Sequence, residues 1–112
     1  MSRDVLSFIV AGSPRTVSRE IEECATASRG VSALVVPWES DAARVNMAVT
    51  AVKSDGWAVE HTNLGTVSLT DVGDGRTRVA VSAEDLAQAA GDTLAAILQT
   101  FAVQIQRRFE PV

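Results

Sequence analysis

Alternating apolar and polar residues between positions 66 and 82 constrain the fold of this chain more than any other feature. Residues 66–70 place valine and leucine on one face and threonine and serine on the other. Residues 76–82 repeat this pattern, with a threonine and two valines opposite two arginines and an alanine. A period of two is that of a β-strand with one buried and one solvated face, which is typical of antiparallel sheets. The sequence therefore predicts a β-hairpin over this segment.

The connection between these two strands, "TDVGDGR", decides between a turn and a ligand site. Asp71, Asp74 and Arg76 are charged, and the two glycines would let the backbone approach an anion. A calcium loop needs more oxygen ligands and a bidentate glutamate at its end, and a phosphate loop opens a helix instead of a strand. Asp-Gly is a preferred hairpin dipeptide because glycine tolerates positive φ. We interpret the connection as a plain turn, with Arg76 and Arg78 on the solvated face of the sheet.

Further strands are predicted on both sides of this hairpin. Residues 57–62 also alternate, and "NLG" after them predicts a tight turn into residues 66–70, which makes the whole an antiparallel meander. "VLSFIVAG" and "VSALVVP" are apolar at most positions, on both alternating faces. Strands covered on both faces have this composition, so we expect residues 5–11 and 31–36 to be interior strands.

Ser13 and Pro14 begin the first predicted helix, over residues 14–29. Serine caps helices, and proline fits the first turn because its missing N–H has no partner there. Apolar residues follow at helical spacing until Gly30, which can end the helix. A strand is the alternative, because residues 17–21 also alternate.

A second helix is predicted over residues 41–56. Ser40 or Asp41 can cap this helix, and Gly56 can end it. Its apolar stripe consists of Val45, Ala48, Val49 and Val52. The cap, the apolar periodicity and the terminating glycine all indicate the same helix.

The last third of the chain predicts a short helix followed by a long one. "SAED", residues 82–85, resembles a capping box and opens a short helix that pauses at Gly91. Asp92 can cap the long helix, whose apolar stripe consists of Leu94, Ile97, Leu98, Phe101, Ile105 and Phe109. We therefore expect a single α+β domain over residues 1–112, in the order β-α-β-α-β-β-β-α, with a mostly antiparallel sheet packed against the long C-terminal helix.

Composition limits the partners of the chain. The 112 residues carry a net charge of −4, whereas nucleic acids and anionic membranes attract basic surfaces, so we expect neither as a partner. Cys24 is the single cysteine, which excludes an internal disulfide and fits a reducing compartment. The N-terminus lacks the pattern of a signal peptide, and the expected location is cytoplasmic. The sequence contains no metal-ligand cluster and no complete phosphate loop, so we expect no metal and no cofactor.

The segment "VAGSPRT", residues 10–16, carries the sharpest chemical signal. A strand followed by Gly-Ser-Pro-Arg and a helix resembles the start of flavodoxin-like flavin reductases, whose loop binds the flavin phosphate. The resemblance implies a phosphate site at Gly12, Ser13, Arg15 and Thr16, whose hydroxyl, N–H and guanidinium groups favour phosphate. The alternative is an ordinary helix start. That family uses a longer chain of repeating strand–helix units, whereas this sequence turns to alternating strands after Gly56.

His61 is the only histidine, and its side chain is the only one that ordinarily titrates near neutral pH. A general acid–base role is one interpretation, and a partly exposed structural residue is the other. No nucleophile neighbours His61 in the sequence, and we expect Cys24 in the core because free cysteine behaves as a small apolar residue. We therefore favour a protein without enzymatic activity over a flavin- or nucleotide-phosphate-binding enzyme that uses the Gly12–Thr16 loop.

"GW-x-V" after the second predicted helix and "GRTRV" before the last one fit a further family. The order of elements over residues 41–109 resembles the later part of START-like helix-grip domains, in which an antiparallel sheet wraps a long C-terminal helix. The resemblance implies a small apolar ligand between the sheet and that helix. We assign this ligand site to Trp57, His61, Phe101 and Ile105. The expected function is that of a small cytosolic binding or protein-interaction domain.

Self-association is also expected, because a chain of this length has a limited core. Two-fold dimers are the commonest soluble oligomers. Val103 lies off the main stripe of the last helix, and Trp38 stands in a polar-flanked loop, so either residue can join an interface. The sequence therefore predicts a homodimer.

Overall fold

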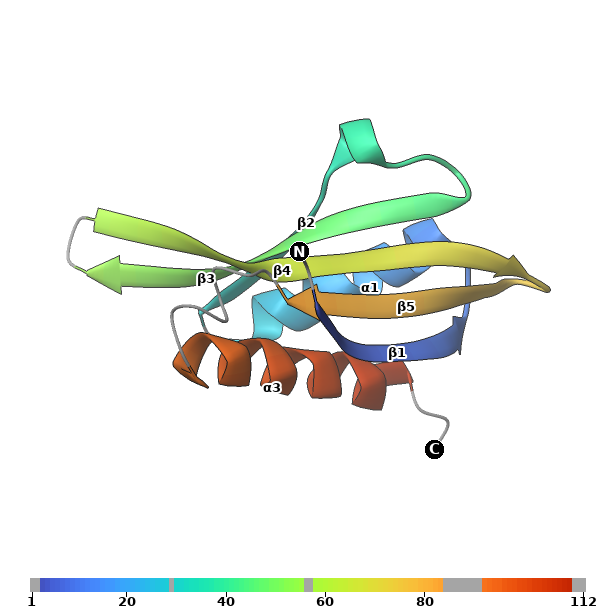
Figure 1. The fold of residues 1–112 in the computed structure, drawn as a ribbon. Coiled ribbons are helices and arrows are strands. Elements are labelled where there is room, and N and C mark those ends of the chain that lie inside the picture. The colour runs from blue at the N-terminus through green and yellow to red at the C-terminus, as the bar shows by residue number, and fades with distance from the viewer. Residues whose placement is uncertain (1–2, 29, 56–57, 84–91, 110–112) are drawn as a thin grey trace.

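A computed structural model describes residues 3–28, 30–55, 58–83 and 92–109. Five antiparallel strands form one sheet in the order β1-β5-β4-β3-β2, and both helices pack against the same core (Figure 1). The elements are β1 (Arg3–Ala11), α1 (Pro14–Ala27), β2 (Val31–Val35), the 3₁₀ helix η1 (Pro37–Glu39), β3 (Arg44–Asp55), β4 (Ala58–Gly73), β5 (Arg76–Ala83) and α3 (Asp92–Phe109). The predicted α+β class is confirmed, as is the C-terminal helix packed on an antiparallel sheet.

The hairpin between β4 and β5 confirms the turn predicted for the Asp-Gly connection. Asp74 and Gly75 have φ angles of 56° and 69°, and a two-residue hairpin turn of the favoured type requires positive φ at both positions. The Asp71 carboxylate accepts a hydrogen bond of 2.8 Å from the N–H of Gly73, which fixes the entry to the turn. The aspartates and glycines of this connection therefore serve its backbone geometry.

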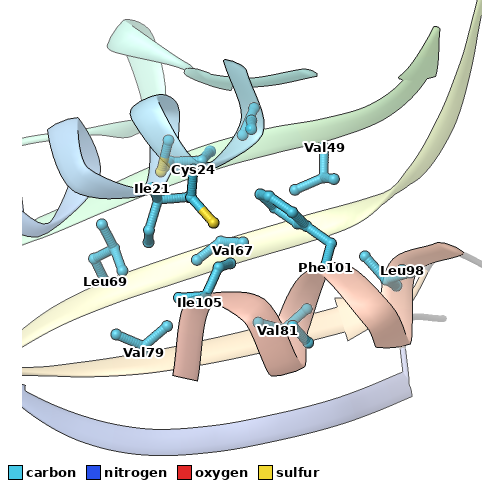
Figure 2. Close-up of a cluster of buried hydrophobic side chains, with 14 of the residues drawn as sticks. Ile21, Cys24, Val49, Val67, Leu69, Val79, Val81, Leu98, Phe101 and Ile105 are labelled. Carbon is cyan, nitrogen blue, oxygen red and sulfur yellow. The ribbon is translucent and has the colours of Figure 1, made fainter. Parts of the chain in front are cut away.

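The hydrophobic core lies between the sheet and the two helices (Figure 2). Inward-facing side chains of the three central strands meet the apolar stripes of α1 and α3 there. The largest fully buried side chains are Ile21, Met47, Leu64, Leu69, Leu98, Phe101 and Ile105. The predicted stripe of the last helix is thus confirmed at Leu98, Phe101 and Ile105. Arg76 and Arg78 are exposed, as the alternation predicted.

α1 confirms the helix predicted over residues 14–29 and rules out its strand alternative. Ser13 is the N-cap, and its Oγ accepts a hydrogen bond of 3.2 Å from the N–H of Thr16. Pro14 occupies the first turn, where its lack of an N–H costs no hydrogen bond. The N-terminal cap and the apolar periodicity together therefore predicted this helix.

The helix predicted over residues 41–56 is wrong, because this segment contains strand β3. Val45, Met47 and Val49 alternate along the chain and are all buried, and β3 pairs with β2 on one side and β4 on the other. The valines fit both a helical and an alternating spacing, and β-branched residues favour the strand. Asp41, the expected cap, instead accepts hydrogen bonds of 2.8 and 2.9 Å from the N–H groups two and three residues later, which forms a turn.

The tight turn predicted at "NLG", residues 63–65, is also wrong, because β4 continues through it. The register of β4 against β3 shifts there by one residue, and Leu64 at this bulge is buried in the core. Gly65 is required by a close approach of two strands, since a Cβ atom at this position would lie 2.0 Å from the carbonyl oxygen of Ser82. The glycine that suggested a turn therefore permits an uninterrupted strand.

The segments 5–11 and 31–36 are not interior strands. β1 and β2, which contain them, are the two edge strands of the sheet. Covering both faces of these strands would require helices on both sides of the sheet, and α1 and α3 both join one core on one side. As a result, the side chains of Ile9 and Leu34 are 52% and 64% exposed.

Two predictions fall partly or wholly outside the described residues. The short helix was expected to begin at Ser82, but this residue belongs to β5, and residues 84–91 lie outside the described part of the chain. Trp57 and Gly56 also lie outside it. The predicted roles of these residues stay predictions.

Candidate functional site

Of the residues assigned to an apolar ligand site, the structure places Phe101 and Ile105 in the core and His61 outside it. Phe101 and Ile105 are 1% and 0% exposed and pack inside the core (Figure 2). His61 is exposed on β4, and Trp57 lies outside the described residues. Phe101 and Ile105 therefore contribute to the packing between the sheet and α3, which accounts for their apolar character without a ligand.

The Gly12–Thr16 loop connects β1 to α1, as the strand–loop–helix pattern predicted. The Gly12 N–H donates to the carbonyl oxygen of Gly75 at 2.7 Å, and the Gly12 carbonyl oxygen accepts from Thr77 Oγ1 at 2.7 Å. Thr77 is fully buried. These bonds hold the loop against the β4–β5 hairpin and occupy both polar backbone groups of Gly12.

The two hydroxyl groups of this loop bond to each other at the start of α1. Ser13 Oγ donates to Thr16 Oγ1 at 3.0 Å and accepts from the Thr16 N–H at 3.2 Å. Both groups therefore take part in capping the helix. The described sheet is antiparallel throughout, whereas flavodoxin-like folds are built on a parallel sheet.

The side chain of Arg15 belongs to a different site, which we call the α1–η1 hollow. This hollow has a volume of about 310 Å³ and lies between α1, the end of β2, η1 and the start of β3. Its lining residues are Arg15, Ser18, Arg19, Glu22, Val35, Pro37, Ser40 and Val45. The walls combine three charged groups and two hydroxyls with an apolar surface.

Serine side chains brace the walls of the hollow through backbone contacts. Ser18 is buried, and its Oγ donates to the carbonyl oxygen of Arg15 at 2.6 Å. Ser40 Oγ donates to the carbonyl oxygen of Val36 at 2.7 Å and accepts from the Asn46 N–H at 3.0 Å. The two bonds of Ser40 join the end of η1 to the residue that follows β2 and to β3, so the outer wall is tied to the sheet.

The charged groups of the hollow have no ionic partner within the described part of the chain. Arg15 and Arg19 lie one helical turn apart on α1, and neither forms an ion pair with Glu22 or with another described residue. The hollow therefore carries two guanidinium groups and one carboxylate, with an excess of positive charge inside a chain whose net charge is −4.

Trp38 lies next to the hollow on η1. Its side chain is 84% exposed, as expected for a residue in a polar-flanked loop, and its neighbour Pro37 lines the hollow. Because Pro37 lines the hollow, the tryptophan that follows it provides a large exposed apolar surface near a charged site. Figure 1 shows the connection between β2 and β3, which includes η1, standing out from the body of the sheet.

The sequence predicted only part of this site. Arg15 and Trp38 were both considered as binding residues, and Arg19 could have been added because a spacing of four places it on the same helix face as Arg15. Val45 could not be placed there, because its segment was predicted to be a helix. The contribution of Pro37 and Ser40 depends on the β2–β3 connection, which no local pattern revealed.

Cys24 and His61, the remaining candidates for chemistry, do not form a catalytic pair among the described residues. Cys24 is buried on α1, and burial raises the pKa of its thiol, although the charge of Arg108 lowers it in part. His61 is exposed on β4, and among the described residues it forms no hydrogen bond with this thiol. Among the described residues, no three His, Cys, Asp or Glu side chains gather as metal ligands do.

Neither α1 nor α3 combines the length and the apolar composition that a membrane-spanning helix needs.

Comparison of the chain with protein-family models, with curated proteins and with solved structures finds no match. The α1–η1 hollow is therefore interpreted from its own geometry and charge.

Proposed function

We propose that this chain is a small, non-enzymatic binding domain whose ligand combines an anionic group with an apolar body and occupies the α1–η1 hollow. The observation that carries this proposal is the pair Arg15 and Arg19, which lie together beside an apolar wall without an ionic partner in the described residues. Guanidinium groups bind carboxylates and phosphates through paired hydrogen bonds.

The apolar part of the ligand has a surface to contact. Val35, Pro37 and Val45 line the hollow opposite the charged side of α1. Small-molecule sites are commonly clefts of about 300–1,000 Å³ with apolar walls and a few polar groups that fix orientation. The hollow, at about 310 Å³, suits a small ligand or one side chain of a larger partner.

An apolar ligand between the sheet and α3 is the less favoured position. Phe101 and Ile105 are buried in the core between α3 and the sheet, so a ligand would have to displace packed side chains.

We retain the cytoplasm as the proposed location because the single cysteine, Cys24, fits a reducing compartment.

A homodimer is also proposed. Val103 on α3 is 36% exposed, and Trp38 is exposed on η1, so both are accessible to a second copy. Light scattering over a concentration series measures this directly. A mass near the 11.8 kDa of one chain at every concentration would exclude the dimer.

The binding proposal is tested with 3-phenylpropionate, a carboxylate on a compact apolar body, and its affinity is measured by ligand-observed NMR. We expect Arg15→Ala and Arg19→Ala each to weaken binding by about tenfold, since a hydrogen bond to a charged group contributes about 1.5–3 kcal/mol. Arg107→Ala is the matched control, because Arg107 is an exposed arginine on α3 away from the hollow. The neutral amide of the same ligand should bind weakly to every variant.

Undiminished binding by the Arg15→Ala, Arg19→Ala double variant would refute the proposal. Phenyl phosphate, measured in parallel, distinguishes a carboxylate site from a phosphate site. The enzyme alternative is tested by titration with FMN: saturable binding that Ser13→Ala abolishes would favour the flavin-phosphate interpretation of the Gly12–Thr16 loop.

A further inference from the structure

β2 is an edge strand, and its backbone groups on one side have no neighbouring strand in the described sheet. The N–H of Val36 donates to Asn46, and the carbonyl oxygen of Gly30 accepts from Val52, each at 2.8 Å. Hydrogen-bonded pairs alternate along an antiparallel ladder, so Ser32 and Leu34 also direct their backbone groups to β3. The N–H and C=O groups of residues 31, 33 and 35 therefore point to the open edge.

This edge lacks three of the features by which proteins commonly prevent strand addition. Charged residues, prolines and bulges on an edge strand discourage pairing with another chain. β2 has the sequence "VSALV", without charge or proline, and its register against β3 is regular over all five residues. Leu34 is also 64% exposed on the outer face of the strand.

The open edge of β2 leads directly into the α1–η1 hollow. Val35 is the last residue of β2, one of the residues whose backbone groups face the open edge, and part of the lining of the hollow. A strand added to β2 would therefore have one end beside Val35, at the hollow that contains Arg15 and Arg19.

We propose that the partner of this site is an extended acidic segment of another protein, which adds a sixth strand to the sheet at β2. Backbone hydrogen bonds to residues 31, 33 and 35 would supply affinity, and carboxylates at one end of the segment would contact Arg15 and Arg19 and set its register. Because every pair of neighbouring strands in the sheet is antiparallel, the added strand runs antiparallel to β2. Its acidic end is then the N-terminal end, which lies beside Val35.

This inference rests on the proposed function but is tested separately from it. The probe is an acetylated and amidated peptide of sequence Asp-Asp-Thr-Val-Thr-Val-Thr, and binding is measured by isothermal titration calorimetry with the full chain. We expect it to bind about tenfold more tightly than the same peptide with Asn-Asn at the start, and than the peptide with Asp-Asp moved to the C-terminal end. Arg15→Ala and Arg19→Ala should reduce its affinity to that of the Asn-Asn peptide, whereas Arg107→Ala should not.

N-methylation of the peptide tests strand addition without altering the protein. N–H groups of successive residues in a strand point to opposite sides, so two peptides methylated at alternate positions differ only in which edge is blocked. We expect one of these peptides to lose binding and the other to bind like the parent peptide. Equal affinities of the two would overturn the inference.

The outcomes separate the two proposals. If 3-phenylpropionate binds through Arg15 and Arg19 while both methylated peptides bind equally, strand addition is refuted and the proposed function stands. If neither 3-phenylpropionate nor the peptide depends on the two arginines, both proposals fail. A second copy of the chain is the other occupant to be tested: a dimer by light scattering whose formation prevents the peptide from binding would also overturn the inference.

Discussion

Two sets of charged side chains on α1 differ in sign, and only one set has an ionic partner among the described residues. The acidic set, Glu20 and Glu23, binds one guanidinium from α3: Arg108 Nε lies 2.7 Å from Glu20, and its Nη2 lies 3.0 Å from Glu23. The hydrogen bond to Glu20, together with its charge, raises the pKa of Arg108 above its usual value. In the N-terminal half, Arg15 and Arg19 have no such partner in the described residues.

The difference shows which charges join the elements of the fold and which are available to a ligand. A second contact, the 2.7 Å hydrogen bond from Ser28 Oγ to Gln104 Oε1, also links the C-terminal end of α1 to α3. Arg15 and Arg19 line the α1–η1 hollow instead of contacting another helix. We infer that Glu20 and Glu23 have a structural role and that Arg15 and Arg19 form a binding surface.

Replacing Ile21 on α1 should have the largest effect, because this buried residue holds the helix that carries both sets of charges. Ile21 is fully buried on α1, and Ile21→Ala should lower the free energy of unfolding by about 2–5 kcal/mol through lost burial and a cavity. Urea denaturation measures this change. Thr26→Ala, an exposed change on the same helix, is the control and should have little effect. A loss below about 1 kcal/mol for Ile21→Ala would mean that α1 is not held by the core.

Loss of the N-cap should affect the first turns of α1, which carry Arg15 and Arg19, more than the residues around Glu23. Ser13→Ala removes the oxygen that accepts from the Thr16 N–H, and such substitutions cost about 1 kcal/mol. Amide hydrogen exchange should accelerate in residues 15–19 and change little near Glu23. Ser13→Asn keeps a capping side chain and should retain protection. Uniform acceleration along α1 would contradict the local role of the cap.

The smallest expected effects on stability are those of replacing Arg108 and Arg15, and these two effects should differ. Arg108→Ala should lower the midpoint of thermal unfolding slightly, because it removes two exposed ion pairs, and the loss should shrink at high salt. Arg15→Ala should leave the midpoint unchanged, because no described ion pair is lost. Differential scanning calorimetry at low and high salt compares the variants. Equal destabilisation by both substitutions would show that Arg15 also has a structural role.

Elements with strong local signals were predictable from the sequence. α1 has a serine cap and a proline in its first turn, the β4–β5 turn has Asp-Gly, and α3 has a long apolar stripe. β3 was not predictable in this way, because Val45, Val49 and Val52 suit a helical spacing as well as a strand. Pairing with β2 and β4 decides between them, and such long-range contacts leave no local pattern.

The candidate site was less predictable than the fold, because it joins segments that are distant in sequence. Arg15 was identified as an anion-binding residue, but the expected partners were the loop residues Gly12 and Ser13. Gly12 is hydrogen-bonded to the β4–β5 hairpin, and Ser13 takes part in capping α1. Once β3 was mistaken for a helix, Val45 could not be placed opposite Arg15, and the hollow could not be anticipated.

Mapping of the binding surface by ¹H–¹⁵N correlation NMR during titration with 3-phenylpropionate tests the central claim most directly. We expect saturable shifts for the amides that surround the hollow, in particular those of Arg19, Val35 and Val45, and no comparable shifts around Phe101. We also expect these shifts to disappear in the Arg15→Ala, Arg19→Ala double variant and to persist in Arg107→Ala. Shifts centred on Phe101 and Ile105 would contradict the claim and place the ligand between the sheet and α3.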